Sequence, residues 1–188
     1  MSELKKSELR ARFRALRADF TDNLGEAERT IAFSKAPAAL INHFKPGRVV
    51  SAYIPVGSEA DPTALLSQAH AVGCRTALPF VTSRASPMQF LHWSPGDPLH
   101  DGPFGLKQPD SSSPPYRPDV ILVPLVAFDS RLMRVGQGAG HYDRALSLLD
   151  NAFSVGIAWS IQQAPALPTD PWDVPLNAVL TEKAWIAP

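Results

Sequence analysis

The chain has 188 residues, of which 45% are apolar, and its 18 Lys and Arg residues balance its 18 Asp and Glu residues. This length suits a single domain spanning residues 1–188, and zero net charge argues against a general nucleic-acid binder. The single cysteine, Cys74, excludes an internal disulfide framework, and no Cys and His cluster has zinc spacing. No secretory signal and no membrane-spanning apolar run is visible, so we expect a cytoplasmic protein that binds neither nucleic acid nor a membrane.

The first part of the chain is predicted to be helical. Residues 3–20 form an amphipathic helix whose apolar face carries Leu9, Phe13, Leu16 and Phe20. Its opposite face is basic and carries Lys6, Arg10, Arg14 and Arg17. Residues 26–44 are also predicted to be helical, with a kink or break at Pro37.

Strands and helices are then predicted to alternate. Residues 48–56 are rich in β-branched and aromatic side chains and indicate a buried strand. A helix follows, with Asp61 as its N-cap, Pro62 at its first position and its end at Gly73. Residues 76–81 and 88–93 are predicted to be short strands. The proline- and serine-rich residues 94–118 are predicted to form a long ordered loop that carries Phe104 and Gly105.

The second half of the chain continues this alternation. Residues 119–128 are almost entirely apolar, which is typical of a strand covered on both faces. A glycine-rich turn at 136–140 leads into a helix from Tyr142 to Asp150. A strand at 154–159, a loop at 160–177 and a closing strand at 178–182 follow. The pattern predicts an α/β fold: a single three-layer domain with a mostly parallel central sheet flanked by helices.

The glycine-rich turn is the strongest candidate for a binding site, because ligands of open α/β sheets bind at the carboxyl ends of the strands. Glycines allow close approach of the backbone, and a helix that begins there directs its amides at an anion, most often a phosphate. Arg134 adds a positive charge, and Asp143 can hold Mg²⁺. The spacing matches neither the P-loop nor the dinucleotide fingerprint. A tight strand-to-helix connection without a ligand is an equal alternative at this point.

The segment from Arg134 to Arg144, after an apolar strand that ends in Phe128-Asp129, resembles the signature of the 5-formyltetrahydrofolate cyclo-ligase family. Four further blocks resemble that family in the same order along the chain. They are Lys6 with Arg10, Tyr53-Ile54 with Glu59, Phe104-Gly105-Leu106 before Pro109, and Trp172-Asp173 before Ala178–Glu182. The resemblance therefore covers nearly the whole chain.

The resemblance implies an enzyme that uses ATP and Mg²⁺ to convert 5-formyltetrahydrofolate to 5,10-methenyltetrahydrofolate, with release of ADP and phosphate. It implies that ATP phosphorylates the formyl oxygen, after which N10 attacks the activated carbon and the ring closes. Such a reaction depends on positioning and on charge neutralisation. The partners would be small molecules only, and we expect a monomer.

The resemblance also implies site residues. Catalytic roles fall on Arg134 and Asp143, and Mg²⁺ ligation falls on Asp143 and Asp173. ATP would be bound by Lys6, Arg10, Arg134, Val135, Gly136, Gln137, Gly138, Ala139, Gly140, His141 and Tyr142. The folate would be bound by Ile54, Glu59, Phe104, Gln137, Gly138, Ala139, Gly140 and His141.

Some of these residues have a second interpretation. Glu59 would accept hydrogen bonds from the pterin N–H groups, or it caps the next helix. Tyr53 and Phe104 either line the site as walls for a flat ring or belong to the core. Arg14 and Arg17 are expected to lie on a solvated face of their helix.

The chain also departs from the family pattern. His141 stands where members usually carry Tyr or Phe, Ala139 replaces a common Gly or Lys, and Leu132 occupies a position that is usually glycine. Two other functions therefore stay open. One is a related α/β enzyme acting on a phosphosugar or an acyl-CoA, and the other is a non-catalytic folate or nucleotide binder.

Overall fold

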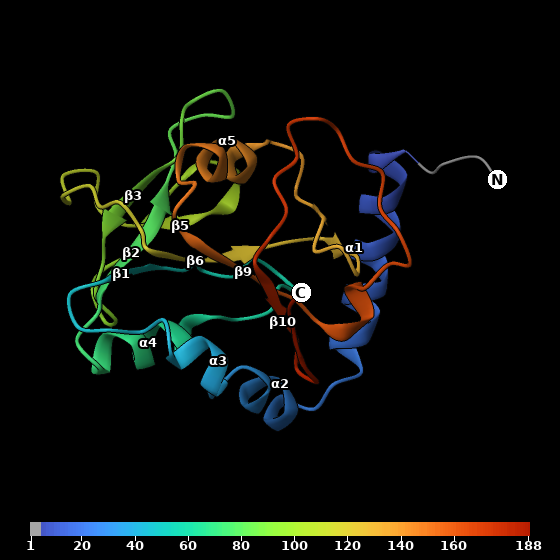
Figure 1. Cartoon of the computed structure of the whole chain (residues 1–188), viewed down its shortest axis with the longest axis horizontal. Helices are drawn as coiled ribbons and strands as arrows, with labels where there is room; N and C mark the ends of the chain where they lie inside the picture. Colours follow the sequence, from blue (N-terminus) through green and yellow to red (C-terminus); the bar gives the residue numbers. More distant parts are fainter. Residues whose placement is uncertain (1–4) are drawn as a thin grey trace.

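A computed structural model describes residues 5–188 (Figure 1). In this part of the chain, seven strands form a sheet in the order β11-β10-β9-β6-β1-β2-β3. The strands are β1 (Val49–Ser51), β2 (Arg75–Phe80), β3 (Gln89–His92), β6 (Val120–Pro124), β9 (Phe153–Ile157), β10 (Ala178–Leu180) and β11 (Trp185–Ile186). The neighbours from β10 to β2 pair in parallel, while β3 and β11 are antiparallel at the two edges. The predicted α/β class with a mostly parallel sheet is confirmed.

Helices cover both faces of this sheet. Figure 1 shows α2 (Glu26–Ala32), α3 (Ala38–Ile41) and α4 (Thr63–Ala71) on one face and α5 (His141–Leu148) on the other. Successive strand residues point to opposite faces, so each central strand contributes to two cores. Val50 and Leu122 pack with Leu40 and Leu65 on the side of α3 and α4, whereas Ile121 packs with residues of α5 on the other side.

The first helix, α1 (Lys6–Asp22), docks on a small hairpin rather than on the main sheet. The hairpin consists of β7 (Ala127–Phe128) and β8 (Arg134–Val135). Leu9 and Phe13 of the apolar helix face are buried with Val126, Val135 and Leu167. This docking places the basic face of α1 beside the glycine-rich turn that follows β8.

Several predicted elements are shorter than expected. The predicted helix 26–44 is two helices, because Pro37 becomes the N-cap of α3. The predicted strand 48–56 pairs only over β1, and the chain then leaves the sheet towards a turn at Gly57, where φ is +61°. The predicted strand 119–128 divides into β6 and β7, because the chain leaves the main sheet after Pro124 to form the hairpin. The helix predicted from Pro62 to Gly73 is also shorter, because α4 begins at Thr63 with Pro62 rather than Asp61 as its N-cap and ends at Ala71. Asp61 accepts the Thr63 amide at 2.8 Å.

The stretches predicted to be loops contain short elements. Residues 94–118 include the antiparallel pair β4 (His100–Asp101) and β5 (Lys107–Gln108), which flank a 3₁₀ turn at Pro103–Gly105. A second 3₁₀ turn spans Ser160–Gln162, and β11 was not predicted. Two-residue strands have too few positions to show a hydrophobic period. Within residues 5–188, no helix has the length and apolar character needed to span a bilayer.

Candidate active site

A cleft of about 620 Å³ opens at the carboxyl ends of β1, β2 and β6. β1 continues through α4 to β2 on one side, while β6 continues through α5 to β9 on the other, so the crevice between β1 and β6 is a topological switch point. All residues expected to contact ligands line this cleft: Lys6, Arg10, Ile54, Glu59, Phe104, Arg134, Val135, Gly136, Gln137, Gly138, Ala139, Gly140, His141, Tyr142, Asp143 and Asp173. Their individual roles stay predictions.

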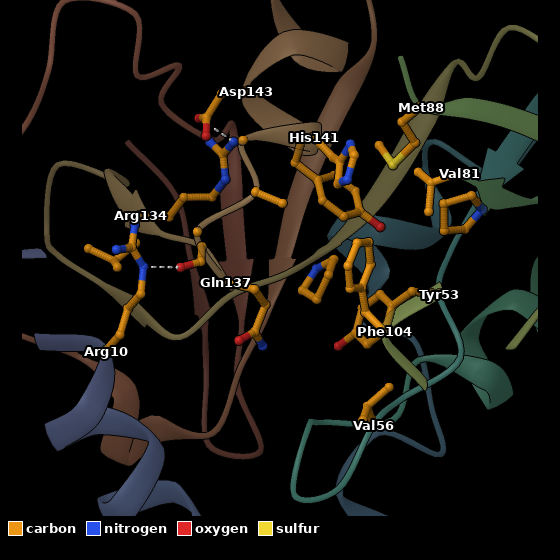
Figure 2. Close-up of a pocket in the computed structure, with 18 of the residues that line it drawn as sticks. Arg10, Tyr53, Val56, Val81, Met88, Phe104, Arg134, Gln137, His141 and Asp143 are labelled. Carbon is orange, nitrogen blue, oxygen red and sulfur yellow. Dashed lines mark hydrogen bonds and ion pairs between the residues drawn. The ribbon is translucent and has the colours of Figure 1, made fainter. Parts of the chain in front are cut away.

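The glycine-rich turn is shaped by two glycines and held by α1. Gly138 has φ of +107°, and Gly140, the N-cap of α5, has φ of +69°, which are conformations that other residues rarely adopt. Arg10 Nε donates a hydrogen bond to the Gly136 carbonyl at 2.8 Å (Figure 2). The turn therefore directs its backbone into the cleft next to a guanidinium.

Arg134 is a buried cation at the base of the turn. Its side chain is 2% exposed, and its Nη2 lies 2.7 Å from Asp143 Oδ1 (Figure 2). Its Nη1 also donates to the Val174 carbonyl. Burial lowers the pKa of Arg134, while the carboxylates of Asp143 and Asp173 act to raise it. Two partners thus hold the guanidinium in one orientation.

Lys6 joins the first helix to the loop before β10. Its Nζ lies 2.6 Å from Asp170 Oδ2 and also contacts Asp173 Oδ2, which in turn accepts the Asp170 amide at 2.8 Å. Burial acts to lower the pKa of Lys6, but the two aspartates raise it overall. Figure 1 shows α1 running beside this loop. The cluster contains one residue, Asp170, that was not predicted.

The carboxylates in the cleft fit a magnesium ion only together with phosphate oxygens. Among residues 5–188, no group of three or more His, Cys, Asp or Glu side chains is arranged to hold a metal. Mg²⁺ is usually held by one or two carboxylates plus substrate phosphates. Asp143 and Asp173 both line the cleft, so its lining offers that number of carboxylates.

Glu59 lies at the end of a hydrogen-bonded chain that crosses the cleft from α1. Arg14 Nη2 donates to Gln137 Oε1 at 2.6 Å, and Gln137 Nε2 donates to Glu59 Oε1 at 2.6 Å. The other Glu59 oxygen accepts the Val56 amide at 3.0 Å. Asp61 rather than Glu59 accepts an amide of α4, so the helix-cap interpretation of Glu59 does not hold.

Two arginines expected on a solvated face also line the cleft. Arg14 contacts Gln137, and Arg17 is only 7% exposed and donates to Ser58 Oγ at 3.0 Å. Burial lowers the pKa of Arg17, and the charge of Glu59 opposes this shift. Their helical spacing from Lys6 and Arg10 could have predicted this position, because all four side chains lie on one face of the helix.

The other side of the cleft is apolar. Figure 2 shows Tyr53, Val81, Met88 and Phe104 on this side, opposite Arg10 and Arg134. Tyr53 is 4% exposed, and its hydroxyl donates to the Ala60 carbonyl at 2.6 Å, so it belongs both to the core and to the wall. Phe104 is 58% exposed with φ of +63°, and the guanidinium of Arg84 lies 5.8 Å from its ring centre. A flat ring could be enclosed here.

Two of the departures from the family pattern, Leu132 and His141, lie close to the glycine-rich turn in the chain. Leu132 is buried in the turn between β7 and β8 and has φ of +61°, the conformation that favours glycine. His141 and Tyr142 each carry a buried polar atom, Nε2 and the hydroxyl oxygen, that has no hydrogen-bond partner within residues 5–188. Burial raises the pKa of Tyr142, and the charge of Glu59 adds to the rise.

Cations around a glycine turn at a switch point are typical of α/β proteins that bind phosphorylated ligands. The sequence profile of the 5-formyltetrahydrofolate cyclo-ligase family matches residues 2–182. The 5-formyltetrahydrofolate cyclo-ligase of Mycolicibacterium smegmatis is 34% identical over 99% of this chain and 98% of the relative. The corresponding Escherichia coli K12 protein is 30% identical over 94% and 98%.

A solved structure agrees with these relatives. The 5,10-methenyltetrahydrofolate synthetase of Aquifex aeolicus superposes with a TM-score of 0.77 at 30% identity, over 98% of this chain and 93% of that one. This chain belongs to the 5-formyltetrahydrofolate cyclo-ligase family.

Proposed function

We propose that this enzyme, a 5-formyltetrahydrofolate cyclo-ligase by family, uses ATP to activate the formyl oxygen of its folate substrate. The γ-phosphoryl group passes to the formyl oxygen, and ADP is released. N10 then attacks the formyl carbon, the oxygen leaves as inorganic phosphate, and the N10 hydrogen is lost as a proton. The product is 5,10-methenyltetrahydrofolate. A monomer in the cytoplasm is the form and place that we expect.

The observation that supports this reaction best is the meeting of two chemically different walls in one cleft. Lys6, Arg10 and Arg134 stand on the wall with the glycine turn, which suits a triphosphate. Glu59 and the apolar wall suit a flat ring with N–H donors. A reaction between ATP and a reduced folate needs both walls within reach of one another.

The residues act mainly by positioning and by charge. Arg134 is buried and held by Asp143, so its charge needs no rearrangement when the phosphoryl group is transferred. Lys6 and Arg10 hold the phosphates, and Glu59, oriented by Gln137, accepts pterin N–H groups. Mg²⁺ held by Asp143 and Asp173 would neutralise phosphate charge. Ile54 and Phe104 enclose the folate.

The test is the ultraviolet absorbance of the methenyl product, followed with 5-formyltetrahydrofolate and Mg²⁺ in the presence and absence of ATP. We expect a rise only with ATP, and a kcat lower by about a hundredfold or more in Arg134→Lys, which keeps the charge but loses the two-partner geometry. Arg29→Gln, on the surface of α2, is the matched control and should behave as the wild type. Binding of folate without turnover would indicate a binding protein, and binding of ATP without binding of folate would indicate another substrate, such as a phosphosugar or acyl-CoA.

A further inference from the structure

Trp172 is a large, exposed aromatic side chain on the charged side of the cleft. Within residues 5–188, which contain all four tryptophans, it is the only one that lines the cleft, and it is 69% exposed. Trp93 and Trp159 are buried, and Trp185 stacks on Phe153 at the edge of the sheet. The indole of Trp172 therefore presents most of its surface to solvent where the cleft opens.

A short turn fixes Trp172 beside the phosphate wall. The turn runs from Asp170 to Asp173 with Pro171 at its second position, and the Asp173 amide donates to the Asp170 carbonyl at 3.0 Å. Proline at this position restricts the backbone to the conformation that the turn requires. The carboxylates of both aspartates contact Lys6 Nζ. Trp172 is thus carried by a restrained turn next to a cation that would hold the phosphates.

The proposed reaction decides which end of ATP faces this turn. The γ-phosphate must reach the formyl oxygen of a folate held against the apolar wall, so the nucleoside points away from that wall. Figure 2 shows Tyr53 and Phe104 of the apolar wall opposite Arg10 and Arg134. Arg134 also donates to the carbonyl of Val174, the residue that follows the turn, so the turn lies on the side of these cations. The nucleoside end of ATP then extends along the cations towards the turn.

The size of the cleft agrees with this direction. A volume of about 620 Å³ suits one drug-sized ligand, whereas the reaction needs ATP and a folate together. The reacting ends of both ligands then occupy the cleft, and the base of ATP lies at its rim. An indole carries no charge that would bind a phosphate, but its flat face suits a flat heteroaromatic base, because such stacking needs no particular hydrogen-bonding edge.

We propose that Trp172 is a nucleotide-binding residue whose indole stacks on the purine base of ATP. The inference rests on the proposed function and gives the base a place beside the triphosphate. The cations hold the phosphates and Trp172 holds the base, so separate side chains bind the two ends of the nucleotide. Because the base is remote from the reacting atoms, the contact contributes to ATP binding in the ground state and the transition state alike.

The test compares Trp172→Leu, which removes the aromatic ring, with Trp172→Phe, which keeps a smaller one. We expect Trp172→Leu to raise Kd and KM for ATP about tenfold, as the loss of one stacking contact implies, and Trp172→Phe to stay within about threefold of the wild type. The kcat and the KM for 5-formyltetrahydrofolate should not change. Inorganic tripolyphosphate with Mg²⁺ has no base and should bind equally to all variants. Leu148→Ala, at a side chain of α5 that is 71% exposed outside the cleft, is the matched control.

Tryptophan fluorescence supplies a readout that does not depend on turnover. Saturating ATP should quench part of the emission of the wild type, because a stacked base lies directly against the indole. This quenching should be lost in Trp172→Leu, because the other three tryptophans lie outside the cleft.

Wild-type affinity for ATP in Trp172→Leu would overturn the inference. An equal loss of tripolyphosphate binding would also overturn it, because the turn would then act only through Lys6. A raised Kd for 5-formyltetrahydrofolate alone would assign the indole to the folate. If the wild type binds ATP but forms no methenyl product, the proposed function fails while the ATP titration still decides the inference, and if it binds no ATP both fall.

Discussion

Among single residues, Asp129 connects the site to the rest of the chain without lining the cleft. It is fully buried and accepts the amides of Arg131 at 3.0 Å, Met133 at 3.2 Å and Leu167 at 3.1 Å. Its Oδ2 also lies 2.7 Å from Arg131 Nη2. Asp129 thus ties the β7–β8 hairpin, which carries Arg134, to the loop that carries Asp173.

We expect Asp129→Asn to lower the free energy of unfolding by about 2–3 kcal/mol, because an amide cannot accept all of these bonds and leaves buried backbone N–H donors unpaired. Burial acts to raise the pKa of Asp129, but its hydrogen bonds lower it overall. The unfolded chain therefore takes up this proton at a higher pH than the folded chain does. The stabilisation is present above pH 4 and is lost as the pH falls below the ordinary aspartate pKa of about 3.9.

Urea denaturation at pH 7 and at pH 3.5 measures the free energy of unfolding of the wild type and of Asp129→Asn. The difference between the two proteins should be smaller at pH 3.5. Asp150→Asn, at a carboxylate that is 77% exposed, is the control and should change stability little. Equal stability of wild type and Asp129→Asn at pH 7 would refute the role given to this carboxylate.

At Leu132 we expect the glycine variant to be more stable than the alanine variant. Leu132→Ala loses buried surface and keeps the left-handed strain, so we expect a loss of about 2–5 kcal/mol. Leu132→Gly loses slightly more surface but removes strain of about 1–2 kcal/mol. The glycine variant should therefore unfold at a higher urea concentration than the alanine variant, the reverse of the usual order. The usual order would mean that the turn relaxes away from positive φ once the leucine is removed.

At the scale of elements, α1 supplies charge to a site built mainly by other segments. Lys6 is paired with Asp170 and Asp173, and in the proposed site ATP would exchange these partners for phosphate oxygens. We expect Lys6→Gln to raise KM for ATP by about tenfold or more, as the loss of a charged hydrogen bond implies, with little change in KM for the folate. Steady-state kinetics in both substrates measures this.

Arg12→Gln is the control for Lys6→Gln, because Arg12 lies on the same helix, stacks on Phe13 and does not line the cleft. Equal effects of the two substitutions would indicate general electrostatic attraction rather than a phosphate contact.

The elements that could be predicted are those with a repeating pattern. Leu9 and Phe13 marked the buried face of α1, and the apolar run at 120–124 marked a central strand. The hairpin β7–β8 and the pair β4–β5 could not be predicted, because two-residue strands depend on their partners. The same holds for Arg17, whose burial depends on Ser58, 41 residues away, and for Asp170, whose partner Lys6 is 164 residues away.

At the scale of the whole molecule, the alternation of helices and strands predicted a site at the carboxyl ends of the strands, but it did not give the strand order or the switch point between β1 and β6. The site residues from the two ends of the chain were expected only from the family resemblance. In the proposed site the ATP phosphates would lie between α1 and the loop before β10, so ATP should join those ends. We expect ATP with Mg²⁺ to slow amide hydrogen exchange in α1 and in residues 164–176 together, with less effect in α2. Protection confined to the glycine turn would contradict this arrangement.

The docking of α1 also determines when this helix can fold into place during synthesis of the chain. Helix α1 is translated well before the segments it contacts, because its apolar face packs on Val126, Val135 and Leu167, and Lys6 reaches an aspartate 167 residues later. This helix can therefore dock only after segments more than a hundred residues further along the chain have been made. Until Val126, Val135 and Leu167 have been made, Leu9 and Phe13 have no partners to pack on in the nascent chain, where a chaperone can bind them.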